Sequence, residues 1–189
     1  MHQNQTNPTK KIVLTALLAA LTVVGSAIRI TIPVDIAGTT SFHLGNILCA
    51  LSGILLGPWY GAAAAGIGSA IYDMLNPLYI SEAWITFVTK GAYGLAAGII
   101  AHTGRKPWGY GKAVLASLAG ALTYAALYLA KTYFYSGILL KGLSPEAAAL
   151  TVVTKLPATV FNAVVAILFA PMLAVAIRRA LERNRLTID

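Results

Sequence analysis

The chain alternates between long apolar runs and short polar connections, and this pattern predicts six membrane-spanning helices. A helix that crosses a bilayer needs ~20 mainly apolar residues. The second and third runs are short and meet at Gly57-Pro58, so one long kinked helix is the alternative there. The first run is longer than a usual signal-peptide core, and we interpret it as a retained span. The predicted limits are Ile12–Ile28, Leu44–Gly57, Trp59–Leu75, Trp84–His102, Ala113–Tyr135 and Ala149–Ile177.

Composition supports a membrane protein. Hydrophobic residues make up 58% of the chain and charged residues 11%, whereas soluble domains carry about 25% charged residues. The 189 residues fit one bundle. We therefore expect a single transmembrane domain over residues 1–189, with a short cytoplasmic tail at 1–11 and a basic one at 178–189. Cys49 is the single cysteine, which excludes an internal disulfide and a multi-thiolate metal site, and we expect no bound metal.

The basic residues indicate the topology. With the N-terminus inside the cell and six spans, most of them lie on the cytoplasmic side near span ends, as the positive-inside rule requires. Five spans would place one basic cluster outside, so an all-α six-helix bundle with both termini cytoplasmic is favoured. The net charge of +8 then reflects topology, and we expect no nucleic-acid partner. Nine of the 14 Lys and Arg residues follow this rule: Lys10, Lys11, Arg105, Lys106, Lys112, Arg178, Arg179, Arg183 and Arg185.

Polar side chains form stripes on three later spans, each running inward from the outer end. Ionisable groups are costly inside a bilayer, at least ~2.5 kcal/mol at its centre, and usually mark function. Residues three, four or seven positions apart share one helix face. We predict that the stripes line one outward-opening pocket for a small polar ligand that carries a ring. They comprise Thr86, Lys90 and Tyr93; Tyr124, Tyr128, Lys131 and Tyr135; and Lys155, Thr159 and Asn162.

Each of these residues also has a structural explanation. Lys90 can form an ion pair with Asp73, at the outer end of the third span. His102 is expected at the inner interface, whereas His43, at the mouth of the second span, is better placed to touch ligand. Lys131 and Lys155 can snorkel to the surface, Tyr128 and Tyr135 can belong to an interfacial belt, and Asn162 can form a helix–helix hydrogen bond.

Motifs for catalysis are absent from the sequence. It has no His-Glu-x-x-His, no Gly-x-Ser-x-Gly and no phosphate-cradling Gly-Lys-Ser/Thr. We therefore expect no enzyme and no ATP hydrolysis by this chain, an intramembrane protease at Ser69 being the weaker alternative. Small residues four apart predict close helix packing, and the first such pair can instead face another subunit. The pairs are Ala16/Ala20, Gly57/Gly61, Ala62/Gly66 and Gly94/Gly98.

Four stretches resemble the S component of energy-coupling factor (ECF) transporters, and the resemblance spans essentially the whole chain. They are Ser41–Asn46, Leu55–Gly61, Gly66–Asp73 and Trp84–Gly91. The resemblance implies a six-helix protein of the bacterial cell membrane that captures a vitamin outside and topples in the bilayer. It docks on a membrane coupling subunit (T component) driven by two ATPase subunits, which hydrolyse the ATP, and binds no cofactor itself. Ala16 and Ala20 match the Ala-x-x-x-Ala docking motif of the family.

The resemblance also implies which residues bind ligand. A neutral ring alcohol of the pyridoxine or hydroxymethylpyrimidine type is favoured. Three lysines and Arg29 towards the outer side favour a ligand with a carboxylate, so folate or pantothenate comes next. The alternative function is a stand-alone ion- or proton-coupled carrier that uses Lys90 and Asp73 as its switch. The implied binding residues are Lys90, Tyr93, Tyr124, Tyr128, Lys131, Lys155 and Asn162, with His43, Asn46, Trp84 and Tyr79 closing the top.

Overall fold

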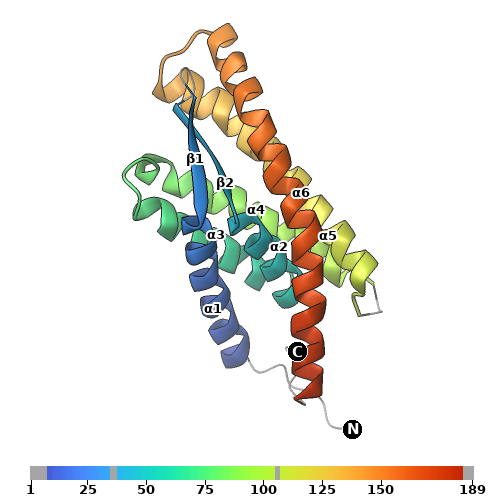
Figure 1. The fold of residues 1–189 in the computed structure, drawn as a ribbon. Coiled ribbons are helices and arrows are strands. Elements are labelled where there is room, and N and C mark those ends of the chain that lie inside the picture. Colours follow the sequence, from blue (N-terminus) through green and yellow to red (C-terminus); the bar gives the residue numbers. More distant parts are fainter. Residues whose placement is uncertain (1–7, 35–37, 105–106, 185–189) are drawn as a thin grey trace.

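The computed structural model describes residues 8–34, 38–104 and 107–184, which form six α-helices and one two-stranded β-hairpin (Figure 1). The hairpin lies at the end of the bundle away from the two chain termini (Figure 1). In chain order the elements are α1 (Pro8–Ala27), β1 (Arg29–Val34), β2 (Gly38–His43), α2 (Gly45–Leu56), α3 (Pro58–Met74), the 3-10 turn η1 (Ile80–Glu82), α4 (Ala83–His102), α5 (Tyr110–Ala130), the π-helix η2 (Lys131–Leu140) and α6 (Pro145–Arg183).

Every predicted apolar run forms a helix. In the part of the chain that the structure describes, four helical segments are long and apolar enough to cross a membrane: α1, η1 with α4, α5 with η2, and α6. Helix α2 has only 12 residues, about 18 Å at 1.5 Å per residue. The alternative of one kinked helix is wrong, because Gly57 has a φ of 81° and reverses the chain. Helix α3 then runs back along α2, and Gly61 lies against the backbone of Gly53.

The connection between α1 and α2 contains the hairpin, which the all-α prediction did not include. Strands β1 and β2 are antiparallel, and Arg29 pairs with His43. Ile30, Thr31 and Ile32 are β-branched, and such residues favour strands over helices. Asp35, predicted in this connection, falls outside the described residues.

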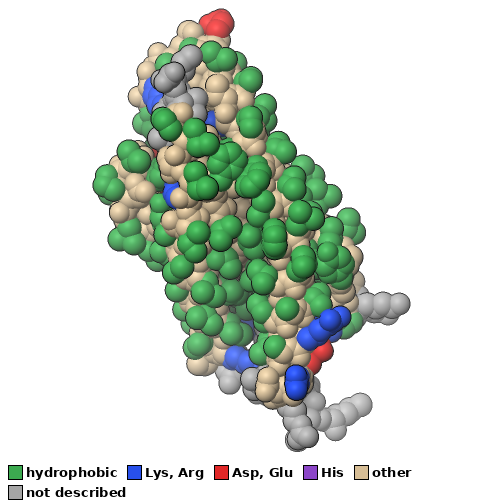
Figure 2. Space-filling view, viewed as in Figure 1, with side chains coloured by type: hydrophobic (Ala, Val, Ile, Leu, Met, Phe, Trp, Pro, Cys, Tyr) green, Lys and Arg blue, Asp and Glu red, His purple; other side chains and the backbone are tan. Residues whose placement is uncertain are grey.

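Helix ends extend further than the sequence indicated. Helix α1 begins at Pro8, so Lys10 and Lys11 are helical, and α6 continues through Arg183. The remaining parts of the expected tails, residues 1–7 and 185–189 with Arg185, fall outside the described residues, as do Arg105 and Lys106. Lys and Arg side chains are visible at both ends of the molecule, including the end where α6 finishes (Figure 2).

Most large apolar side chains face outward and many small or polar ones face inward, whereas on α2 the large residues Ile47, Leu51 and Ile54 are buried in the core. Leu, Ile, Val and Phe cover the visible surface of the helices (Figure 2). Alanine, threonine and serine fill much of the interior; Thr22, Ser52 and Ser117 have no exposed surface. Lipid is as apolar as leucine, so helix association in a bilayer depends on close packing of small residues and on hydrogen bonds.

Glycine permits the closest of these contacts. A Cβ on Gly94 would lie 2.5 Å from the carbonyl oxygen of Gly61, and one on Gly98 would lie 2.5 Å from Cα of Pro58. The predicted packing role is thereby confirmed for Gly61, Gly94 and Gly98, whereas Gly57 lies in the turn before α3 and a Cβ there would meet nothing closer than 3.8 Å. Helices α2, α3 and α4 form a block that supports one wall of the pocket described next.

Candidate functional site

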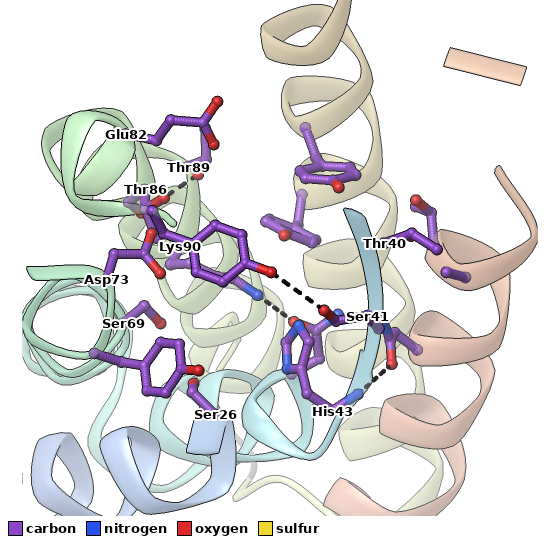
Figure 3. A pocket seen from close by; sticks show the side chains of 18 of the residues that line it. Ser26, Thr40, Ser41, His43, Ser69, Asp73, Glu82, Thr86, Thr89 and Lys90 are labelled. Atoms are coloured by element: carbon purple, nitrogen blue, oxygen red, sulfur yellow. Dashed lines mark hydrogen bonds between the residues drawn. The ribbon is translucent and has the colours of Figure 1, made fainter. Parts of the chain in front are cut away.

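A polar pocket lies between the hairpin and helices α2 to α6 (Figure 3). Nine of the eleven residues predicted to bind ligand line it: His43, Asn46, Tyr79, Lys90, Tyr124, Tyr128, Lys131, Lys155 and Asn162. The three predicted stripes therefore converge, although they come from helices far apart in sequence.

Lys90 lies deep in the pocket and is only 5% exposed. Its Nζ donates a hydrogen bond to Oδ1 of Asn46, in the first turn of α2, and lies 3.8 Å from the centre of the Tyr124 ring. Among the described residues the ion pairs are Lys131–Glu82 and Arg178–Glu182. Lys90 therefore makes no direct ion pair with Asp73, although both side chains face the pocket.

Tyrosine rings form the inner wall. The ring centres of Tyr124 and Tyr128 are 5.5 Å apart with 26° between their planes, and Tyr93 stacks below Tyr124 at 5.7 Å. The structure corrects the placement of Tyr93, which is 0% exposed and lies beneath the lining. Gly120 on α5 makes this possible, because a Cβ there would lie 2.5 Å from the Tyr93 ring. Tyr128 faces the pocket and is not a belt residue.

Glu82 connects η1 to the π-helix η2. One carboxylate oxygen accepts from Nζ of Lys131 and the other from Oγ of Ser136, each at 2.6 Å. The side chain of Lys131 is 8% exposed, so Lys131 is buried in an ion pair and does not snorkel. Glu82 was not predicted as a site residue, since its partners are 49 and 54 positions away in sequence.

Trp84 and Tyr135 lie outside the pocket, contrary to the prediction for Trp84. Trp84 is 60% exposed, and its indole N–H donates to Oη of Tyr135 at 3.2 Å. The predicted stripe assumed an α-helical period throughout. From Lys131 onward the chain is π-helical, with more residues in each turn, and Tyr135 is therefore rotated away from the face that Tyr128 and Lys131 share.

Asn162 attaches the hairpin to α6. Its Oδ1 accepts from the backbone N–H of His43 at 3.0 Å, and its Nδ2 donates to the carbonyl of Ser41 at 2.8 Å. Phe42 packs edge-on against Phe161 beside this pair of bonds. The alternative of a hydrogen bond between Asn162 and a neighbouring helix is replaced by these two bonds to a strand.

His43 is held in its neutral form. Burial lowers the pKa of His43 well below its usual value, and the charges of Lys90 and Arg29 lower this pKa further. Its Nδ1 accepts from the backbone N–H of Gly45 at 3.2 Å, which places the remaining proton on Nε2. His102, at the other end of the bundle, contacts the carbonyl oxygen of Ile54 at 3.0 Å and takes no part in the pocket.

Arg29 is a pocket residue that was not included among the predicted binding residues. Its guanidinium lies 4.2 Å from the Tyr72 ring centre and 5.0 Å from that of Tyr79, and Nε donates to the carbonyl of Ser26. The sequence predicted a loop at Arg29, and a loop does not fix the direction of a side chain. In the hairpin, Arg29 pairs with His43, and both residues line the pocket. Further lining residues outside that set are Ser26, Thr40, Ser41, Ser69, Tyr72, Asp73, Glu82, Thr86, Thr89, Ala158 and Thr159.

The arrangement suits reversible binding. It combines flat aromatic surfaces with separate hydrogen-bonding and charged groups, which is how proteins hold small polar ring compounds. Across residues 8–34, 38–104 and 107–184, no three His, Cys, Asp or Glu side chains form a group that can hold a metal ion.

Comparison with known proteins assigns the chain to a family. Residues 6–179 match the family model described as "ECF-type riboflavin transporter, S component". A curated relative from Pyrococcus woesei, described as an uncharacterized protein in gap 3′region, is 31% identical over 118 residues, or 62% of this chain and 74% of the relative. The chain belongs to the family of ECF-type riboflavin transporter S components, which are the vitamin-binding membrane subunits of ECF transporters.

Proposed function

We propose that this S component captures a small ring-bearing vitamin or vitamin precursor from outside the cell in the pocket under the hairpin. One observation carries the proposal: a ring wall of Tyr124 and Tyr128 faces a pocket that also contains the buried ammonium of Lys90. A stacked pair of rings favours a flat ligand, and an ammonium favours oxygen or nitrogen acceptors on that ligand.

The substrate class follows from the same groups. A neutral ring alcohol of the pyridoxine or hydroxymethylpyrimidine type is our first choice, because Lys131 and Arg29 are already engaged by other pocket residues. Riboflavin, which the family description names, is a second flat candidate. Folate and pantothenate, which carry carboxylates, come next, with Lys155 as their counter-charge.

Delivery requires partners. We propose that the chain docks on a membrane coupling subunit through Ala16 and Ala20, which are exposed on one face of α1. Two ATPase subunits hydrolyse the ATP, and this chain binds no cofactor. Side chains of only one carbon leave a shallow surface on which two helices can approach closely and separate again.

The proposed topology has six spans in the cell membrane of a bacterium, with both termini cytoplasmic. Lys10, Lys11 and Lys112 lie at the end of the bundle that carries α6 residues Arg178 and Arg183. That basic end is cytoplasmic by the positive-inside rule. The pocket and hairpin then face outward, as capture of an external ligand requires.

A binding screen tests the proposal. The purified chain in detergent is titrated with B vitamins and their precursors, while thermal stability and the fluorescence of Trp59, Trp84 and Trp108 are followed. One saturable hit supports a capture subunit. Failure of every ring-bearing compound to bind, in a sample that melts cooperatively, contradicts the proposed substrate class.

The stand-alone carrier remains the second candidate, because Lys90 and Asp73 face one pocket without pairing. Uptake into proteoliposomes distinguishes the two functions. An S component needs the coupling and ATPase subunits together with ATP. A carrier needs only this chain and an ion gradient, and an uncoupler abolishes its uptake.

A further inference from the structure

Most charged groups of the pocket are engaged by other pocket residues. Glu82 accepts one donor on each oxygen. Lys131 is paired with Glu82, and Lys90 bonds Asn46 beneath the Tyr124 ring. Arg29 lies over the rings of Tyr72 and Tyr79. These four charges therefore shape the pocket, and a ligand has to compete with a protein partner for each of them.

Asp73 is different. Within the described residues it forms no ion pair, and the side chain next to it that can donate a hydrogen bond is Thr86. A carboxylate offers about four lone-pair positions, so most of its accepting capacity is unused. Lys90, Lys131 and Arg29 influence it only through longer-range electrostatics.

The position of Asp73 is also unfavourable for folding. It lies in the last turn of α3, which ends at Met74. The carbonyl end of a helix carries partial negative charge, so a carboxylate there is repelled, whereas a cation would be stabilised. A partly buried carboxylate at that end, without a counter-ion in contact, contributes little to stability. Residues that break a local rule in this way are concentrated at functional sites.

The direction of Asp73 indicates what it accepts. Figure 3 shows its carboxylate directed into the cavity from α3, with the ribbon of α6 on the opposite side. The α6 side supplies Lys155, whose ammonium lies 5.9 Å from the centre of the Tyr128 ring. The stacked rings of Tyr124 and Tyr128 line the same pocket as Asp73 and Lys155. A flat ligand on these rings would present one edge to Asp73 and the other toward Lys155.

We infer that Asp73 is a specificity-determining residue that selects ligands whose heteroaromatic ring presents N–H donors, as an aminopyrimidine, a pterin or the imide edge of a flavin does. This inference rests on the proposed function. An ionised carboxylate only accepts hydrogen bonds, so a ring that offers acceptors alone at that edge leaves Asp73 unpaired and is repelled by its charge. Lys155 serves the opposite, acceptor-bearing edge.

Matched ligand pairs test the inference. The first pair is 4-amino-5-hydroxymethyl-2-methylpyrimidine and 5-hydroxymethyl-2,4-dimethylpyrimidine, in which a methyl group replaces the amine. The second is riboflavin and 3-methylriboflavin, which lacks the ring N–H. Fluorescence titration of the full chain should give at least about tenfold tighter binding of the N–H member of whichever pair binds, since hydrogen bonds to charged groups are the stronger ones.

Variants assign the preference to a residue. Asp73→Asn should weaken the N–H member about tenfold and leave its methyl analogue within about twofold, so that the preference disappears. Lys155→Met should weaken both members by a similar factor and keep the preference. Glu146→Gln and Lys141→Met, both outside the pocket, should change neither.

The outcomes separate the inference from the proposed function. A preference that survives Asp73→Asn, or wild-type binding without a preference, overturns the inference alone. Absence of binding by all four compounds counts against the proposed substrate class and removes the inference with it. If Asp73→Asn loses both members, Asp73→Glu decides: a restored preference supports the inference, and none overturns it.

Discussion

At the scale of single residues, Lys90 has an ammonium group that is costly to bury, and it occupies a central position in the pocket. Its ammonium is buried at membrane depth and is held by an amide oxygen and a ring face. Lys90→Ala should weaken binding of the pocket's ligand at least about tenfold, because a hydrogen bond to a charged group is lost. The melting temperature should hold or rise, since burying an ammonium is costly. Ligand titration and thermal unfolding are measured on one preparation. Normal binding with reduced stability would show that Lys90 is structural.

His43 predicts a pH dependence of stability. Its pKa is lowered by burial in the folded chain, while an unfolded histidine titrates near ~6.5. The unfolded state therefore binds the extra proton first, and folding stability is retained above about pH 6.5 and lost as the pH falls below it. Thermal unfolding from pH 8 to pH 5 measures this loss. His43→Gln should flatten the profile and His102→Gln should not. An unchanged slope in His43→Gln would rule His43 out as its source.

Residue types and helical spacing were sufficient to predict the lysines, tyrosines and Asn162 that line the pocket from three helices, whereas Asn46 and Tyr79 came from the family resemblance and twelve other lining residues lay outside the predicted binding set. Lys90 and Tyr124 were found because charged and aromatic residues are conspicuous in apolar helices. Glu82 and Arg29 were missed because their roles depend on contacts distant in sequence. Trp84 and Tyr93 were wrongly predicted to line the pocket. The spacing of residues in a helix predicts which of them share a face, but it gives neither the depth of a side chain nor a change from α-helix to π-helix. Local sequence therefore predicts which residues lie near the pocket better than it predicts which of them line it and which lie behind the lining.

At the scale of elements, the hairpin depends on one amide for its attachment to α6. Asn162→Ala would remove the acceptor of the His43 N–H and the donor to the Ser41 carbonyl. Loss of these bonds should cost about 1–3 kcal/mol locally. Hydrogen exchange of the β2 amides should accelerate, and ligand dissociation should become faster. Asn184→Ala, at the far end of α6, is the control. Unchanged β2 exchange in Asn162→Ala would mean that other contacts hold the hairpin.

The α2–α3–α4 block depends on the absence of side chains. A Cβ on Gly53 would lie 2.9 Å from Ala97 Cβ and would also overlap the carbonyl oxygen of Gly94. Gly53→Ala should therefore destabilise the protein by about 1–3 kcal/mol, as overpacked cores do. Gly111→Ala, where a Cβ meets nothing within 4 Å, is the matched control. Thermal unfolding in one detergent compares the two, and equal melting temperatures would show that the block can adjust.

At the scale of the whole molecule, binding and delivery should be separable. Ala16→Trp or Ala20→Trp places a large ring on the exposed face of α1, far from the pocket lining. Ligand affinity should be unchanged, while uptake by the complex with the coupling and ATPase subunits should fall at least about tenfold, because a close helix interface no longer forms. Leu122→Trp, on the exposed side of α5, controls for bulk in the lipid-facing surface. Intact transport in both alanine variants would exclude this face as the docking site.

The glycine contacts of α2, α3 and α4 make the packing on the two sides of the bundle different. On one side, backbone lies directly against backbone at Gly53, Gly61 and Gly94, so there are few side chains to repack. On the other, α5, η2 and α6 line the pocket with side chains such as Tyr128, Lys131 and Lys155. A lineage can exchange residues such as Tyr128 or Lys155 without disturbing the opposite half. The same architecture can thus acquire a new cargo by changing one wall, while the glycine-packed side keeps the shape of the bundle.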